Sequence, residues 1–176
     1  MEKKNNTLYN LIFPVWMLLL FPPVWLVVLP ANYAVDLLVT RLTMRYLKME
    51  DRKEKAKKVI VKVWIFGFLA DIIGVMPMLA ATVMQLDYSS GFGKWWNENI
   101  VRSINMNPFR SFEGILLTIF CITLAGMFIF IFNSKISFKS DDFAEYERKK
   151  LSAALAIFTA PYFLLLPTTL LYGYGI

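Results

Sequence analysis

The 176-residue chain contains no histidine and only one cysteine, Cys121. Without a second cysteine no disulfide can form within the chain, and without histidine the Cys/His metal sites and Ser-His catalytic pairs are excluded. P-loop, Rossmann and nucleophile-elbow patterns are also absent. We therefore expect no cofactor and no metal, and non-catalytic roles are favoured over enzymatic ones.

Charged residues are scarce in several long stretches of the chain. They make up 18% of the sequence, against 57% hydrophobic residues, and they fall almost entirely between apolar blocks of roughly 20 residues. Blocks of this length match the hydrocarbon core of a bilayer, which about 20 helical residues can cross. The sequence predicts an all-α integral membrane bundle, a single domain over residues 1–176 with the lipid bilayer as its surroundings.

The apolar blocks predict about four spanning segments. The first covers residues 8–29 and continues into residues 31–47, and the others cover residues 59–86, 114–132 and 151–171. A basic loop at 48–58, a polar loop at 87–112 and a connection at 133–150 separate them. In the polar loop, Trp96, Ile100 and Ile104 recur every four residues, which predicts a short helix at the membrane interface.

Lysine and arginine are distributed unevenly among these connections. Residues 41–62 hold nine, residues 133–150 hold five and residues 87–112 hold three. Because basic loops stay on the cytoplasmic side, we expect a multi-pass protein of the cell membrane with loops 48–58 and 133–150 cytoplasmic. Loop 87–112 and the C-terminus are then external. The net charge of +6 is attributed to anionic lipid headgroups at the basic loop, and no nucleic-acid partner is expected.

The basic loop is itself predicted to be helical. Asp51 with Lys55, and Glu54 with Lys58, have the i,i+4 spacing at which opposite charges pair on an exposed helix.

Small residues inside the apolar blocks mark candidate helix contacts. Gly67, Gly74 and Gly126, the last next to Ala125, would let neighbouring helices approach closely, within the chain or between copies.

The first apolar block carries four prolines between residues 14 and 30. Each proline removes a helix donor, and a bilayer supplies no water in its place, so a broken helix is expected only where protein or water covers it. We expect two short apolar pieces hinged at Pro22 and Pro23, then a new helix with Asn32 as its cap. The segment either crosses once, as its length favours, or re-enters as a hairpin, as Lys3 and Lys4 favour.

Two acidic residues inside apolar blocks are the main candidate site residues. Asp36 lies nine residues before Arg45 and Asp71 lies nine residues after Lys62, so both are about 13 Å from basic residues on the same side. If their helices are antiparallel neighbours, the carboxylates share a depth, and such a pair suits proton coupling or cation binding. Arg41 is the third candidate, as a basic group with which Asp36 could pair.

A structural role for the same acids is the alternative. Asp36 would then be a first-turn acid or an ion-pair partner, and Asp71 would bond to a backbone or hydroxyl group. The local sequences YAVD and GFLAD lack the G-x-G-D spacing of intramembrane aspartyl proteases, which argues against that chemistry.

Two functions are favoured by the sequence, ahead of a third, an enzyme acting on lipid, which the absence of histidine disfavours. The leading hypothesis is a small transport or channel protein, with Asp36 and Asp71 lining a polar site beside the broken segment at 14–30. The competing hypothesis is a non-catalytic membrane subunit or scaffold that docks a partner through that segment. Four short spans leave little room for a pathway, so we expect a homo-oligomer or a membrane partner subunit if the protein transports.

Overall fold

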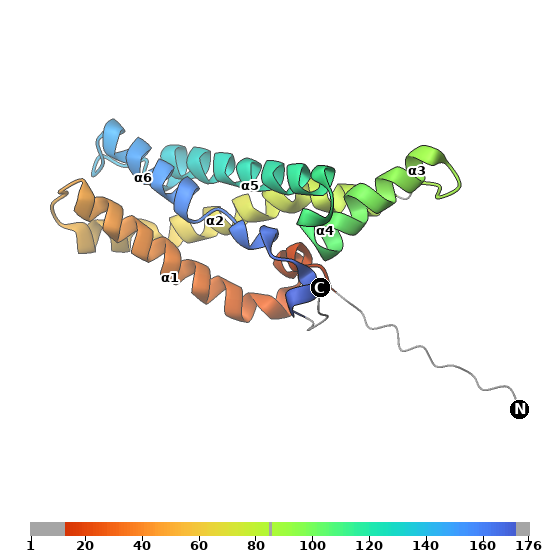
Figure 1. Ribbon diagram of the computed structural model, residues 1–176. Helices are drawn as coiled ribbons and strands as arrows, with labels where there is room; N and C mark the ends of the chain where they lie inside the picture. The colour runs from red at the N-terminus through yellow and green to blue at the C-terminus, as the bar shows by residue number, and fades with distance from the viewer. Residues whose placement is uncertain (1–12, 85, 172–176) are drawn as a thin grey trace, which may run out of the picture.

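The computed structural model describes residues 13–84 and 86–171, and these residues contain helices and no β-strand. The longer helices are α1 (Pro22–Tyr46), α2 (Arg52–Val83), α5 (Phe112–Phe132) and α6 (Glu145–Phe158), which run beside one another in Figure 1. The shorter elements are η1 (Val15–Leu20), α3 (Gly91–Trp96), η2 (Asn97–Val101), α4 (Arg102–Met106), η3 (Pro108–Arg110), η4 (Asn133–Ser137), η5 (Tyr162–Leu165) and α7 (Thr168–Leu171).

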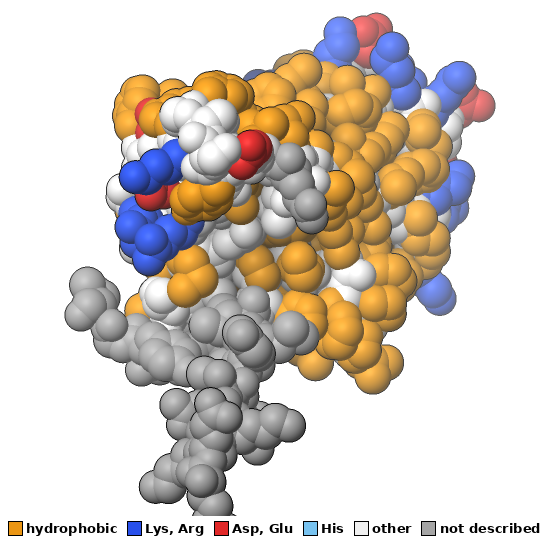
Figure 2. Space-filling view, turned by 90° about the vertical axis from the view of Figure 1, so that its right-hand side faces the viewer, with side chains coloured by type: hydrophobic (Ala, Val, Ile, Leu, Met, Phe, Trp, Pro, Cys, Tyr) orange, Lys and Arg blue, Asp and Glu red, His pale blue; other side chains and the backbone are white. Residues whose placement is uncertain are grey.

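Three helices are long and apolar enough to cross a membrane: Pro22–Tyr46, Arg52–Val83 and Phe112–Ser137, the last formed by α5 and η4. At 1.5 Å per residue the shortest is about 37 Å long, more than the roughly 30 Å of a bilayer core. Figure 2 shows a broad surface of hydrophobic side chains, with charged side chains gathered at its margins. The helices expected in the second and third apolar blocks are therefore present.

The fourth apolar block does not form one spanning helix, contrary to expectation. α6 ends at Phe158, and η5 and α7 follow as short separate pieces. Pro161 lacks the amide hydrogen that would continue α6, and it disfavours helical angles at the preceding Ala160. The described residues therefore contain three helices of spanning length, where about four spans were expected.

The prolines near the N-terminus fulfil one expectation and overturn another. Pro22 and Pro23 occupy the first turn of α1, directly after the extended residue Phe21, which confirms the predicted hinge. Pro30, however, lies inside α1, so no new helix begins at Asn32 and that prediction was wrong.

A contact from α2 supports α1 at its internal proline. The Trp64 indole donates to the Leu29 carbonyl at 2.8 Å, directly before Pro30 in the chain. Because Pro30 removes the donor of the Leu26 carbonyl, four residues earlier, this bond does not replace the lost one, but it does tie α2 to the turn of α1 that contains the proline.

The segment before α1 folds against the bundle. Trp16 and Leu19 on η1 are each 1% exposed. The Trp16 indole donates to the Asn105 side-chain oxygen at 2.9 Å, and the Val15 amide donates to the Thr168 hydroxyl at 3.1 Å. Residues 1–12, with Lys3 and Lys4, and residues 172–176 lie outside the described residues, and so do the expectations that depend on them.

Three glycines allow close helix contacts, as predicted. A Cβ at Gly74 on α2 would stand 2.6 Å from the Ala125 Cβ on α5. A Cβ at Gly67 would stand 3.4 Å from a carboxyl oxygen of Asp36 on α1, and one at Gly126 would stand 3.3 Å from a carbonyl oxygen of α6. Gly74 and Gly126 therefore set how closely α5 approaches α2 and α6, whereas a Cβ at Gly67 would make an ordinary van der Waals contact with Asp36.

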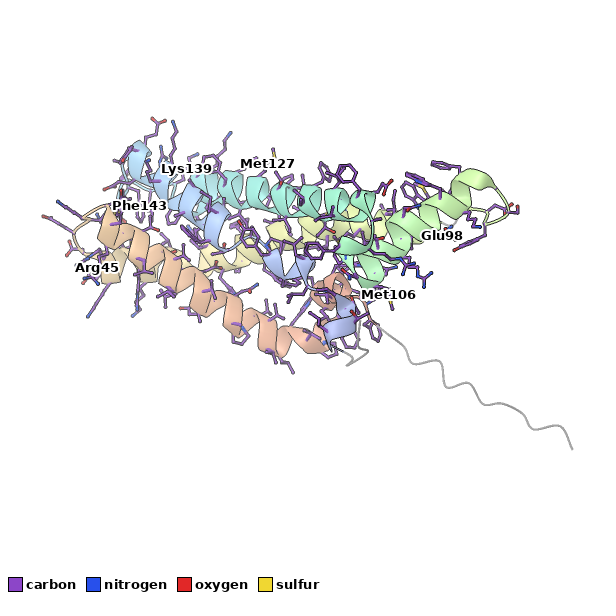
Figure 3. The ribbon with its side chains drawn as sticks, in the orientation of Figure 1. Arg45, Glu98, Met106, Met127, Lys139 and Phe143 are labelled. Atoms are coloured by element: carbon purple, nitrogen blue, oxygen red, sulfur yellow. The ribbon has the colours of Figure 1, made fainter. Side chains whose placement is uncertain are left out.

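The two basic connections lie at one end of the bundle. Lys58, near the start of α2, is 3.2 Å from the Asp142 carboxylate in the connection 133–150. Figure 3 shows Arg45 and Lys139 at this end and Glu98 at the other end. We call the end with Arg45 and Lys139 the basic end.

The basic run is helical, as predicted, because α2 begins at Arg52. Its ion pairing differs from the prediction. Lys58 pairs with Asp142 and not with Glu54, and Asp51 stands before the helix with a left-handed φ of 52°. The reason is that the connection 133–150 folds over the start of α2 and brings an acid from outside the helix.

The loop between α2 and α5 contains the predicted short helix. α3, η2 and α4 follow one another without interruption, and Ile100 and Ile104 are buried against the bundle. The Trp96 indole donates to the Ala81 carbonyl of α2 at 3.3 Å. This helical stretch therefore covers the end of α2 opposite the basic end.

Candidate functional site

The two aspartates predicted as site residues lie together inside the bundle. Asp36 on α1 and Asp71 on α2 are each 5% exposed. A carboxyl oxygen of Asp36 lies against Gly67, which is one turn before Asp71 on the same face of α2. Both aspartates line one cavity of about 200 Å³. The antiparallel hairpin of α1 and α2 thus gives the shared depth that the sequence led us to expect.

This cavity, which we call the acid cavity, is large enough for water. A water molecule occupies about 30 Å³ in the liquid, so several fit within 200 Å³. Its walls come from α1, α2, one residue of α5 and the turn after α6: Asn32, Val35, Asp36, Gly67, Phe68, Asp71, Ile129, and residues 158–163.

The turn after α6 forms the third wall of the acid cavity. Thr159 ends the helix, and its hydroxyl donates to the Leu155 carbonyl at 2.8 Å while its side chain interacts with the Asp36 carboxyl. Pro161 then prevents the helix from continuing. The broken segment beside the acids is therefore residues 158–163, whereas the segment at 14–30 was expected there.

The acid pair has no basic partner in its cavity. Asp71 Oδ1 is buried and has no hydrogen-bond partner among the described residues. The other polar side chains of the lining are Asn32, Thr159 and Tyr162, and no lysine or arginine is among them. Ionised carboxylates in such a place are costly, so uptake of a proton or another cation is favourable there.

Arg41 lies elsewhere. It is exposed on α1 and does not line the acid cavity. The structure therefore brings together two of the three predicted site residues.

Four further buried polar atoms lack a hydrogen-bond partner within residues 13–84 and 86–171: Thr40 Oγ1, Asn133 Oδ1, Ser137 Oγ and Ser152 Oγ. They lie on the side of the acid pair that leads to the basic end. By helical rise, Thr40 is about 6 Å along α1 from Asp36, and Ser152 is about 10 Å along α6 from Thr159. Unpartnered buried polar atoms are rare and usually mark ordered water or functional sites.

Sequence reasoning missed three polar residues of the cavity. Asn32 was assigned to a helix cap, and Thr159 and Tyr162 were not singled out. A signal for the last two was present, because they flank Pro161, and a proline inside an apolar block predicts a break. What the pattern lacked was any indication of which break faces the acids.

No protein-family model, curated protein or solved structure matches this chain. Among the described residues no three Cys, Asp or Glu side chains lie close enough together to hold a metal ion, and the carboxyl groups of the acid cavity are those of Asp36 and Asp71.

Proposed function

We propose that this is a multi-pass protein of the cell membrane with a transport or channel-like role, in which Asp36 and Asp71 bind a proton or another monovalent cation. The observation that carries the proposal is the Asp71 Oδ1 atom, which is buried without a partner in a cavity that also holds Asp36. An ionisable group inside an apolar membrane helix is expensive, and such groups mark ion pathways, proton relays, voltage sensors or the counter-ions of ligands.

The broken wall of the acid cavity supports this role. Transporters place cations where a helix is interrupted, because the ends of the interrupted helix expose polar backbone groups. Here the interruption after Phe158 faces the two carboxyl groups directly. The carboxyl groups of the lining are Asp36 and Asp71, while the Tyr162 hydroxyl donates to the Ile157 carbonyl at 2.7 Å and α5 contributes only Ile129.

The unpartnered polar atoms support a route to the cavity. Thr40 on α1 and Ser152 on α6 lie between the acids and the basic end. Asn133 and Ser137 lie on η4, which continues α5. Each needs a hydrogen-bond partner that water can supply. Water along these positions would connect the acids to the aqueous phase at the basic end.

The proposed arrangement in the membrane follows from the basic end. α1, α2 and α5 cross the bilayer, with loops 48–58 and 133–150 cytoplasmic and loop 87–112 external. Anionic lipid headgroups then contact the basic loop. That the protein forms a homo-oligomer, or binds a membrane partner subunit, stays a prediction from the sequence.

A non-catalytic subunit that docks a partner through its N-terminal segment has less support. Trp16 and Leu19 on that segment are buried against the chain's own bundle, so their surface is already in use.

The proposal is tested in vesicles that hold the purified chain and a pH-sensitive dye. Dilution into Na⁺, K⁺ or tetramethylammonium salts should change the internal pH with the wild type. Asp36→Asn and Asp71→Asn should reduce the response to that of empty vesicles without reducing the folded yield. Asp141→Asn, at an exposed acid of the connection 133–150, is the control and should keep the response. Full activity in both cavity variants, or no response from the wild type with any cation, would contradict the proposal.

A further inference from the structure

α1 and α6 enclose an apolar groove of about 780 Å³ next to the acid cavity. Val39 and Leu42 line it from α1, and Ala154, Ile157 and Phe158 line it from α6. Ligand sites for small molecules usually have volumes of about 300–1,000 Å³ and mostly apolar walls, so the groove has the size and character of such a site.

The groove and the acid cavity adjoin. Phe158 lines both, and Val35 in the cavity lies one turn before Val39 in the groove on the same face of α1. From Asn32 in the cavity to Tyr46 in the groove, α1 rises about 21 Å. They are separate hollows that share Phe158 as a wall, and together they offer a ligand a polar end and an apolar body.

The two ends of this combined site carry opposite charge. Asp36 and Asp71 lie at one end, and Lys150 lines the groove at the end toward the basic connections. A positively charged group is attracted by the two carboxyl groups and repelled by Lys150. This asymmetry fixes the orientation of a charged ligand.

We propose that the cation bound by the acid pair is amphiphilic, an amine or quaternary ammonium whose apolar chain lies in the α1–α6 groove. This inference rests on the proposed function and names its class of substrate. The head contacts Asp36 and Asp71, and the chain extends along Val39 and Leu42 toward Lys150. Because the groove is lined by apolar side chains of two helices that face lipid, such a ligand reaches the acids from within the bilayer.

The test measures binding of labelled dodecyltrimethylammonium to the full chain in nonionic-detergent micelles, with empty micelles subtracted. Saturable binding is expected with the wild type. Asp36→Asn and Asp71→Asn should weaken it at least about tenfold, since each removes a charge that faces the head. Ala154→Leu, which adds bulk to the groove, should weaken it by a similar factor. Thr123→Leu, at an exposed residue of the separate groove between α5 and α6, is the matched control and should bind as the wild type does.

Competition with unlabelled compounds identifies which part of the ligand matters. Tetramethylammonium and dodecanol, which supply the head and the chain alone, should each compete at least about tenfold less well than unlabelled dodecyltrimethylammonium. Equal competition by dodecanol, or by dodecyl sulfate, would overturn the inference, because the groove would then be an ordinary lipid site. Equal competition by tetramethylammonium would overturn it too. The proposed function would survive that result if proton flux still required Asp36 and Asp71.

Discussion

Replacing Asp71 with leucine should make the protein more stable while it abolishes transport. The side chain is 5% exposed, its Oδ1 atom has no hydrogen-bond partner, and the Asp36 carboxyl nearby interacts unfavourably with it. Asp71→Leu removes both penalties, and the adjoining cavity of about 200 Å³ accommodates the new side chain. The acid is therefore expected to be retained for function at a cost in stability.

The expected gain is about 1–3 kcal/mol, the usual penalty for a buried polar atom without a partner. For a chain of this length, each kcal/mol corresponds to a shift of about 2–4 °C in the midpoint of thermal unfolding. The gain should be absent in Asp141→Leu, because Asp141 is exposed and carries no such penalty.

The chain carries its own reporter for this measurement. Cys121 is the only cysteine in the sequence and is 0% exposed, so a thiol-reactive fluorophore labels the protein only as it unfolds. The unfolding midpoint of wild type, Asp71→Leu and Asp141→Leu can be compared in one detergent. A fall of several degrees in Asp71→Leu alone would refute the reasoning, since the carboxyl would then be holding the fold together.

Two further predictions concern residues that do not line the acid cavity. Gly74→Leu should lower the unfolding midpoint by an amount equivalent to about 1–3 kcal/mol or more, because even a Cβ would stand 2.6 Å from the Ala125 Cβ. The same thiol assay measures the midpoint. An unchanged midpoint would show that α2 and α5 do not lie this close together. In the loop 87–112, the Ser89 hydroxyl and amide donate to Asp87 at 2.6 and 2.9 Å and lower the pKa of that carboxyl below 3.8. The Asp87 carboxylate therefore stabilises the turn fully above about pH 3.8, and this stabilisation is lost as the pH falls through the lowered pKa. Ser89→Ala should raise the pKa of Asp87, which a carbon-13 NMR titration measures. An unchanged pKa would show that the Ser89 hydroxyl does not stabilise the carboxylate.

The sequence predicted the helices and the acid pair because both follow from local signals. Asp36 and Asp71 stand out as charges inside apolar blocks, and an antiparallel hairpin gives them a common depth. The prolines were harder to interpret. Pro22 begins a helix, Pro30 lies within one and Pro161 ends one, although all three lie in apolar stretches.

The difference among these prolines depends on distant residues. Beside Pro30, the Leu29 carbonyl accepts a hydrogen bond from Trp64, which lies 35 residues away along the chain. Thr159 belongs to the site only because α6 lies against α1 and places its last turn beside Asp36. Neither contact has a signal within a short window of sequence, so the third wall of the cavity could not be predicted.

If the acid pair exchanges a proton for a cation, binding of the cation must release the proton. The most direct measurement is the pH change when dodecyltrimethylammonium, Na⁺ or K⁺ is added to the unbuffered, detergent-solubilised protein at near-neutral pH. Two carboxyl groups that share a proton should release about one proton per chain as a cation binds. This release is expected with at least one of these cations for the wild type, and none is expected for the double variant Asp36→Asn, Asp71→Asn. Release that persists in the double variant, or no release from the wild type with any cation, would show that Asp36 and Asp71 do not exchange a proton for a cation.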